Sequence, residues 1–284
     1  LLVRNSMSPL PSEHRPSYRQ KFLPDRTDIT WACPWKAAKA LIFPLHCACC
    51  QQACRESSTR VVLCTDCEKS LLAEQAAACR RCGFFFPVSK LSQFQLDQGD
   101  LPVTNCPGCA NRKLWFDDTF ALGPYRGSLR EAVLRSKRAA EETLTLSLGA
   151  LLGRRLHKLP ELRSVDMVIN TPMHWKRRLH RGISTTELLL SGILSQLNLR
   201  SASGLLRCTR STGKQGMLSS SQRQRNVSRA FRITVPHRVR DQHLLVVDDV
   251  MTSGATLNEI ARILHRAGAR RISNVVLARG YCLG

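Results

Sequence analysis

Long hydrophobic runs and the common nucleotide-binding loops are both missing from this sequence of 284 residues. No apolar stretch approaches the roughly 20 residues that a membrane-spanning helix needs. The opening Leu1-Leu2-Val3 is too short for the hydrophobic region of a signal peptide, so we expect a cytoplasmic protein with no transmembrane segment. We also find no Gly-x-x-x-x-Gly-Lys-Ser/Thr, and no Gly-x-Gly-x-x-Gly after a strand. The sequence therefore does not indicate a P-loop or a dinucleotide fold.

Acidic residues are scarce as well. There are 21 Asp and Glu against 43 Lys and Arg, which gives a formal net charge of +22. Such a balance favours polyanionic partners, namely nucleic acid, phosphorylated ligands or acidic membrane surfaces. A basic surface that merely keeps the protein soluble is the alternative, and charge alone does not exclude it.

The thirteen cysteines are numerous for a chain expected in a reducing compartment. Eight of them form four Cys-x-x-Cys turns within a segment of 63 residues: Cys47 with Cys50, Cys64 with Cys67, Cys79 with Cys82, and Cys106 with Cys109. The two-residue gap lets both sulfurs of a turn converge on one ion, and two turns supply the four thiolates of a tetrahedral Zn²⁺ site. We therefore predict two structural zinc ions.

Other interpretations of the cysteines are weaker. A redox function would need a Cys-x-x-Cys at the start of a helix in a thioredoxin-like context, which is missing. An iron–sulfur cluster is less typical of this regular spacing. Cys49 and Cys54 lie close enough in sequence to replace Cys47 or Cys50, so that choice of ligand stays open.

Residues 244–256 are the stretch around which the remainder of the chain is organised. Four apolar residues, 244–247, predict a strand buried on both faces. The acidic pair Asp248-Asp249 follows where that strand is expected to end. Residues 252–256 then form a short polar turn that leads into a helical pattern from Leu257. Backbone N–H groups at such a helix start bind phosphate, and the adjacent acids can hold sugar hydroxyls or Mg²⁺.

This arrangement strongly resembles the phosphoribosyl pyrophosphate (PRPP) motif of type I phosphoribosyltransferases. The resemblance implies that the acids hold the ribose hydroxyls and that the turn holds the 5-phosphate. The implied catalytic residues are Asp248 and Asp249, which also bind PRPP together with Thr252, Ser253, Gly254, Ala255 and Thr256. An ordinary buried strand followed by an N-capped helix is the alternative.

The chain after the last cysteine turn alternates between strand and helix patterns. Strands are expected near residues 118–122, 165–170, 244–247 and 271–277, and helices near 129–138, 142–157, 185–197 and 257–266. Residues 198–240 are polar, basic and poorly periodic. The alternation predicts a parallel sheet with right-handed crossovers, whose ligands bind at the carboxyl ends of the strands.

A basic loop follows the strand near residues 165–170. Its candidate contacts to pyrophosphate or nucleic acid are His174, Lys176, Arg177, Arg178, Arg181 and Gly182. Fixed cations there could neutralise a departing pyrophosphate, or they could bind nucleic-acid backbone. Aromatic residues that could stack on bases are few, with only Trp175 and Phe231 between residues 154 and 240. This scarcity weakens a dedicated single-strand platform.

From residue 36 onward, the order of these features resembles the ComF family of competence-associated proteins, including its ComFC and GntX types. Beyond the cysteine turns, the resemblance rests on Phe116-Asp117, residues 125–130, Lys137, residues 171–174 with Arg177 and Arg181-Gly182, Gln215, Leu218, Arg223, Asn226, Phe231 and residues 248–256. It implies an α/β fold, a type I phosphoribosyltransferase-like parallel sheet flanked by helices, with a small N-terminal double zinc ribbon. The expected domains are a disordered leader at 1–35, the double zinc ribbon at 36–115 and the phosphoribosyltransferase-like domain at 116–284.

The resemblance further implies a role in DNA uptake and natural transformation, but it leaves the activity open. One hypothesis is an enzyme that transfers a phosphoribosyl group from PRPP, with Mg²⁺, to an acceptor that the sequence does not name. The alternative is a non-catalytic factor that binds single-stranded DNA through its basic face and zinc ribbons. The third is a scaffold that only holds partner proteins through the zinc ribbons. The expected protein partners are those of the DNA-uptake machinery.

Overall fold

The structure is a computed structural model that describes residues 45–54, 63–73, 77–86, 106–175, 178–179, 182, 184–210 and 220–280. All of them lie in one compact unit, Pro44–Gly284. The expected leader at 1–35 falls outside the described residues, as do Lys176, Arg177 and Arg181 of the basic loop. Within the described ranges, no helix is both long enough and apolar enough to cross a membrane.

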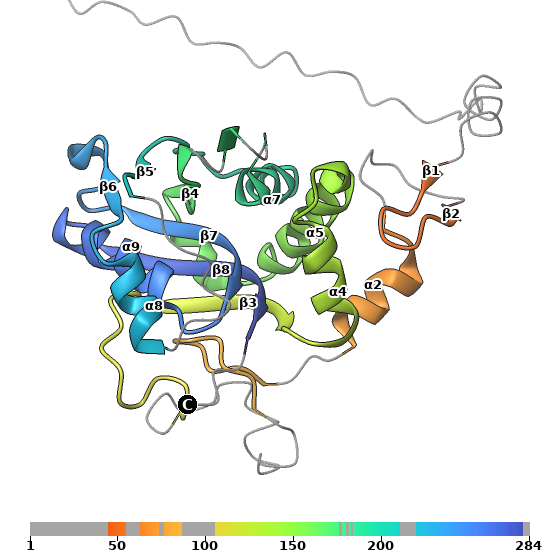
Figure 1. Cartoon of the computed structure of the whole chain (residues 1–284), viewed down its shortest axis with the longest axis horizontal. Helices are drawn as coiled ribbons and strands as arrows, with labels where there is room; N and C mark the ends of the chain where they lie inside the picture. Colours follow the sequence, from red (N-terminus) through yellow and green to blue (C-terminus); the bar gives the residue numbers. More distant parts are fainter. Residues whose placement is uncertain are drawn as a thin grey trace, which may run out of the picture. The chain divides into compact units, whose positions relative to one another are not determined.

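A parallel sheet forms the centre of this unit, as the alternation of strands and helices predicts (Figure 1). Its strands in the order β3-β8-β7-β4 are β3 (Asp118–Pro124), β8 (Arg271–Arg279), β7 (His243–Met251) and β4 (Met167–Asn170). Every neighbouring pair in this sheet runs parallel, so the carboxyl ends of all its strands meet at one edge. Two small antiparallel pairs join β1 (Leu45–His46) to β2 (Ala53–Cys54) and β5 (Leu206–Cys208) to β6 (Phe231–Ile233).

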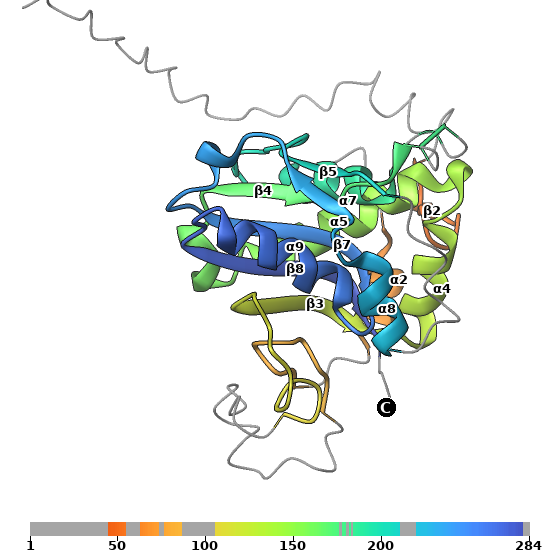
Figure 2. The ribbon, with the colours of Figure 1, turned by 60° about the vertical axis from the view of Figure 1, so that its left-hand side comes forward.

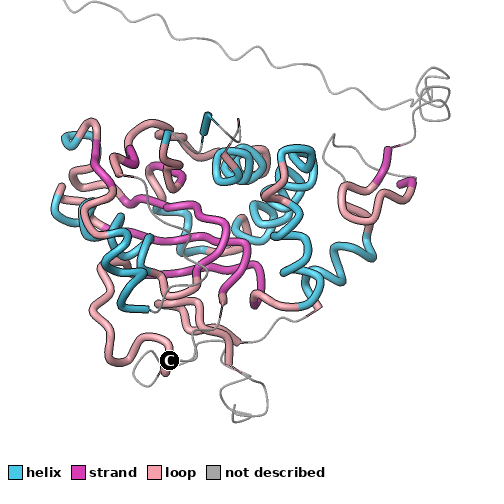
Figure 3. The backbone as a smooth tube through the Cα atoms, in the orientation of Figure 1, coloured by secondary structure: helices cyan, strands magenta, loops and turns pink. Residues whose placement is uncertain are grey.

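Helices pack on the sheet and are distinguished from strands and loops in Figure 3. In chain order they are α2 (Thr65–Leu72), α4 (Gly127–Arg135), α5 (Glu142–Leu156), α7 (Thr185–Leu194), α8 (Ser220–Val227) and α9 (Ala255–Arg266). Short 3-10 turns are η3 (Ala139–Glu141), η4 (Pro160–Ser164) and η6 (Pro236–Arg238). Figure 2 shows α9 and α8 in front of the sheet.

Alternate residues of β7 face two different hydrophobic cores. Leu244 and Val246 belong to the core that contains the apolar face of α9. Leu245 and Val247 belong to the core that contains residues of α4, α5 and α7. Side chains alternate between the faces of a strand, so a strand that is apolar at four successive positions must be covered on both sides. The four apolar residues at 244–247 therefore explain why helices cover both faces.

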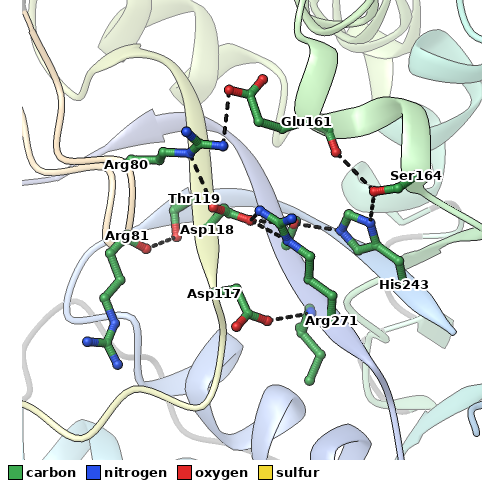
Figure 4. Close-up of polar contacts among 11 residues, drawn as sticks. Arg80, Arg81, Asp117, Asp118, Thr119, Glu161, Ser164, His243 and Arg271 are labelled. Atoms are coloured by element: carbon green, nitrogen blue, oxygen red, sulfur yellow. Dashed lines mark hydrogen bonds and ion pairs between the residues drawn. The ribbon is translucent and has the colours of Figure 1, made fainter. Parts of the chain in front are cut away.

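A buried polar network joins the amino ends of β3, β7 and β8, at the edge away from the carboxyl ends (Figure 4). The Asp118 carboxylate accepts hydrogen bonds from Arg271 at 2.7 Å and from the Ser273 hydroxyl at 3.0 Å. The His243 ring contacts Ser273 and Ser164 through its two nitrogens, each at 2.9 Å. Because these buried polar groups satisfy one another, the network stabilises the strand register.

Candidate functional site

The acidic pair lies within the last part of β7 rather than after it. The sequence suggested that the strand ends before Asp248, but β7 continues to Met251 because β8 is equally long and pairs with it as far as Arg279. Asp248 is buried, and Asp249 is partly exposed beside it. The Asp249 carboxylate forms an ion pair with Lys137, with 2.9 Å between Oδ2 and Nζ. The site therefore contains a cation that the sequence did not assign to it.

Burial affects the ionisation of both Asp248 and Lys137. It raises the pKa of the Asp248 carboxyl well above its ordinary value, and the neighbouring charge of Asp249 raises that pKa further. Burial is the largest single influence on Lys137 and lowers its pKa, but the charge and hydrogen bond of Asp249, with the charges of Tyr125 and Asp248, together outweigh burial and raise the net pKa of Lys137. Lys137 therefore keeps its positive charge beside Asp249, whereas Asp248 holds its proton more readily than an exposed carboxyl does.

A short turn connects β7 to α9 and lines a small pocket together with Asp248. The pocket is formed by Asp248 and residues 250–257. Gly254 has a φ of 74°, and a Cβ at this position would lie 2.5 Å from the Cε atom of Met251. The left-handed backbone favours glycine here, whereas the flexible end of the Met251 side chain could move away from a Cβ. The backbone of the turn leads directly into the first residues of α9, where the helix dipole favours a bound anion.

The basic loop begins at the same edge of the sheet. Asn170, the last residue of β4, lies opposite Val247, the residue before Asp248. His174 is buried, and its ring lies 5.7 Å from the ring of Trp175. Trp175 is 58% exposed. An ion pair of 2.9 Å joins Arg178 to Glu187 of α7, so this predicted phosphate-binding residue already has an acidic partner.

The first four cysteine ligands predicted from the sequence come together. The sulfur atoms of Cys47, Cys50, Cys64 and Cys67 all lie within 4.8 Å of one another. A Zn–S bond of about 2.3 Å implies sulfur atoms about 3.8 Å apart in a tetrahedron, and Cys50 and Cys64 are 3.8 Å apart. Burial raises the pKa of the Cys47 thiol, but hydrogen bonds from backbone amides, the largest from Cys64, more than offset burial and bring the pKa to about 6. Neither Cys49 nor Cys54 belongs to this group, which could hold a metal ion.

The second group consists of Cys79, Cys82, Cys106 and Cys109, and all four are buried. The sulfur of Cys79 is 3.9 Å from that of Cys109, and the sulfur of Cys82 is 3.6 Å from that of Cys106. A hydrogen bond from Cys82 is the main reason why the pKa of Cys79 falls to about 5. Four thiols at these separations, one of them readily ionised, suit a tetrahedral thiolate-binding metal.

The two groups pack on different cores. Ala48 and Cys49 of the first group's turn pack against the core that contains α4 and α5, and Arg135 of α4 donates to the carbonyl of Cys49 at 2.6 Å. The cysteines of the second group belong to the core that contains α9. The turn between Cys79 and Cys82 also attaches to β3, because Thr119 donates its backbone N–H to the Arg80 carbonyl at 2.8 Å.

Residues 187–282 match the family model described as "Phosphoribosyl transferase domain". This match and the parallel sheet flanked by helices define the chain as a phosphoribosyltransferase-like α/β protein with two cysteine groups that could hold metal. Among solved structures, the hypoxanthine phosphoribosyl transferase of Trypanosoma cruzi has a TM-score of 0.33 and 17% identity. The match covers 49% of this chain and 66% of that chain.

Two relatives show to which family this phosphoribosyltransferase-like chain belongs. The DNA utilization protein YhgH of Escherichia coli O6:H1 is 30% identical over 189 residues, which cover 64% of this chain and 82% of that protein. Competence protein F of Haemophilus influenzae is 27% identical over 228 residues, which cover 76% of this chain and 90% of that protein. The chain belongs to the family of these two proteins, the ComF family.

Proposed function

We propose that this chain binds PRPP with Mg²⁺ at the carboxyl ends of β7 and β4, as a phosphoribosyltransferase-like protein that serves DNA uptake and natural transformation. The observation that carries the proposal is the acidic pair in β7, followed at once by a glycine-containing turn that lines a small pocket at the start of α9. The names of the relatives, DNA utilization protein and competence protein, support the link to DNA.

Each part of PRPP has a matching group in this arrangement. The carboxylates of Asp248 and Asp249 accept hydrogen bonds from the ribose hydroxyls, and they lie where they can also hold Mg²⁺ through its water shell. The backbone of residues 252–256 binds the 5-phosphate. The loop of residues 171–182 faces the pyrophosphate and neutralises the charge that develops on it.

The chemistry that this arrangement supports is phosphoribosyl transfer. The bond between C1 and the pyrophosphate oxygen breaks, pyrophosphate leaves with the electron pair, and an acceptor nucleophile forms the new bond to C1. Asp248 and Asp249 orient the ribose during this step, while the basic loop stabilises the leaving group. Lys137 holds Asp249 in place through their ion pair.

Calorimetry with PRPP and Mg²⁺ tests the proposal directly. We expect saturable binding of one PRPP per chain, and competition by ribose 5-phosphate and by pyrophosphate separately. No detectable heat and no competition at millimolar ligand would contradict it.

The raised pKa of Asp248 predicts a pH dependence of PRPP binding. Mg²⁺ and ribose hydroxyls bind the ionised carboxylate, so binding should release a proton from chains in which Asp248 is still protonated. Affinity should therefore rise as pH increases through the raised pKa and level off above it. Titrations in buffers of different ionisation enthalpy measure the proton release. An Asp248→Asn variant should release fewer protons, and equal release in both proteins would contradict the assignment to Asp248.

The exposed side chains of the basic loop support a second candidate function, the binding of single-stranded DNA. Trp175 is 58% exposed and Leu179 is 77% exposed beside Arg178. An exposed aromatic ring within a basic loop is the combination that stacks on bases while cations contact the backbone. This surface could accept DNA whether or not the neighbouring site binds PRPP.

A salt titration separates this candidate from a site for small ligands only. Replacing the loop cations Lys176, Arg177, Arg178 and Arg181 together by Ala should weaken single-stranded DNA binding equally for all sequences. It should also lower the slope of log K against log salt by about 0.7 for each DNA phosphate that the loop no longer neutralises. Trp175→Ala should weaken binding without changing that slope.

The matched control removes four exposed arginines outside the loop, Arg200, Arg207, Arg232 and Arg238. The control has the same net charge as the loop variant. If both lose the same affinity for single-stranded DNA, the loss is due to the lower net charge and not to the loop. Wild-type affinity and slope in the loop variant would contradict a DNA site on this loop.

A further inference from the structure

Two arginines connect the second cysteine group to the turn that follows β7. Arg112 lies three positions after Cys109, and its guanidinium donates to the Gly108 carbonyl at 3.4 Å and to the Ser253 carbonyl. Arg279, the last residue of β8, donates through Nε to the Cys82 carbonyl at 2.9 Å. Each arginine therefore contacts one Cys-x-x-Cys turn of the second group.

The same guanidinium of Arg279 reaches the turn. Its Nη1 donates to the Met251 carbonyl at 3.0 Å and also contacts the Thr252 carbonyl. Arg279 is only 3% exposed, so these contacts form in a poorly solvated region where a charged hydrogen bond is strong. Together the two arginines hold three successive carbonyls, those of Met251, Thr252 and Ser253.

Peptide geometry gives these contacts a consequence for the other side of the turn. Each peptide unit is planar and trans, so the N–H of the next residue points opposite to the carbonyl. When arginines hold the carbonyls of residues 251–253, the N–H groups of residues 252–254 must point away from those arginines. The two arginines thus fix the orientation of the amide donors from the carbonyl side of the turn, and they do so without contacting an anion bound on the amide side.

A third residue fixes the start of α9 to the same segment. The Asn258 side chain donates to the Lys113 carbonyl at 3.1 Å and accepts from the Trp115 amide at 2.8 Å. Residues 112–115 begin three positions after the last cysteine ligand, Cys109. The segment that leaves the second group is therefore attached both to the turn and to the first part of α9.

The first cysteine group has different neighbours. Its contacts to the sheet unit pass through α4 and α5, where Arg135 donates to the Cys49 carbonyl at 2.6 Å and Arg154 pairs with Glu68 of α2. In the described part of the chain, these contacts do not involve residues 251–258. The two groups thus offer the same four thiol ligands but contact different parts of the fold.

We propose that Arg112 and Arg279 are positioning residues that link the second cysteine group to residues 251–254. Because of this link, the turn keeps its phosphate-binding conformation only while the second group binds a metal ion. The first group has no such effect. The inference rests on the proposed phosphate-binding role of the turn, and it assigns to one of the two metal sites a function beyond structural support.

The first experiment compares one cysteine variant in each group. Cys106→Ser and Cys50→Ser should each retain one zinc per chain instead of two, measured by elemental analysis. Hydrogen exchange at the amides of Asn258 and Gly280, which donate to the turn carbonyls of Gly254 and Met251, should accelerate at least tenfold in Cys106→Ser and stay within twofold of wild type in Cys50→Ser, measured without ligand and well below melting. Equal acceleration in both variants, or in neither, would overturn the proposal.

The second experiment keeps both metal ions and removes only the connection. Arg112→Gln should retain two zinc ions and the wild-type melting temperature within a few degrees. Its affinity for ribose 5-phosphate should fall by about ten- to hundredfold, the effect of removing one hydrogen bond to a charged group. Its affinity for pyrophosphate, which the basic loop binds, should not change. Arg112→Lys can reach only one of the two carbonyls and should give an intermediate effect.

Arg80→Gln is the matched control, because Arg80 belongs to the same cysteine group but pairs with Asp118 and Glu161 instead of the turn. It should bind ribose 5-phosphate like the wild type. If Arg112→Gln behaves like Arg80→Gln in both exchange and affinity, the proposal is wrong. If the wild type binds no ribose 5-phosphate, the proposed function fails, while the exchange data still decide whether the second group orders the turn.

Discussion

The Asp248→Asn, Asp249→Asn double variant should bind PRPP about two to four powers of ten more weakly than the wild type. The substitution keeps the shape of both side chains but removes the charged acceptors for the ribose hydroxyls and Mg²⁺. Removing a charge-assisted hydrogen bond typically costs about 1.5–3 kcal/mol, and two such bonds give this range. Calorimetry with PRPP and, separately, with pyrophosphate measures the effect, which should be much smaller for pyrophosphate because it has no ribose.

The structure indicates that the fold tolerates this change. Asn resembles the protonated form that burial favours for Asp248. Removing the partner of Lys137 should cost about 1 kcal/mol or less, because the Lys137 side chain is 36% exposed and water screens the pair. The melting temperature should therefore change by only a few degrees.

The control for the double variant removes two charges at exposed positions, Glu131→Gln and Asp241→Asn. Asn suits position 241, where φ is 59°. The control should bind PRPP like the wild type. If the Asp248→Asn, Asp249→Asn variant binds PRPP normally but melts far below the wild type, the acidic pair serves the fold and our assignment of its role is wrong.

The second large effect concerns the metal. We expect two zinc ions per chain after purification without chelator, and a decrease of about 10 °C or more in melting temperature when a strong chelator removes them. Structural zinc contributes folding free energy directly, and a few kcal/mol shift the melting of a chain of this size by about that amount. Elemental analysis that finds iron, or no metal, would contradict the zinc prediction.

The two cysteine groups should differ in this respect. Cys106 is completely buried in the core that contains α9, whereas Cys50 is exposed. Cys106→Ser should therefore lower the melting temperature more than Cys50→Ser, because disrupting a buried ligand also disrupts part of the hydrophobic core around it. The reverse order would show that the first group is the main support of the fold.

Local patterns in the sequence predicted most of the central sheet. The strand at 244–247 is a strong signal because four successive apolar residues, two of them β-branched, indicate a strand covered on both faces. The helical pattern from Leu257 is strong because its apolar residues repeat with the period of a helix, and the structure confirms both elements as β7 and α9. Residues 198–240 looked poorly periodic, yet they contain β5, α8 and β6. Strands of three residues are too short to show a period, so the pairing partner alone defines them.

The sequence by itself determined the four Cys-x-x-Cys pairs, because each turn brings two sulfurs together locally, whatever the chain does elsewhere. The structure decided that Cys47 and Cys50, and neither Cys49 nor Cys54, join Cys64 and Cys67. The sequence also determined the parallel sheet and the order of strand, acidic pair, turn and helix. Only the tertiary structure placed Lys137 beside Asp249, Arg112 on Ser253, which is 141 positions away, and Arg279 on Cys82, which is 197 positions away. Contacts over such separations depend on how the sheet, α9 and the cysteine turns pack together, and no local period or spacing encodes that packing.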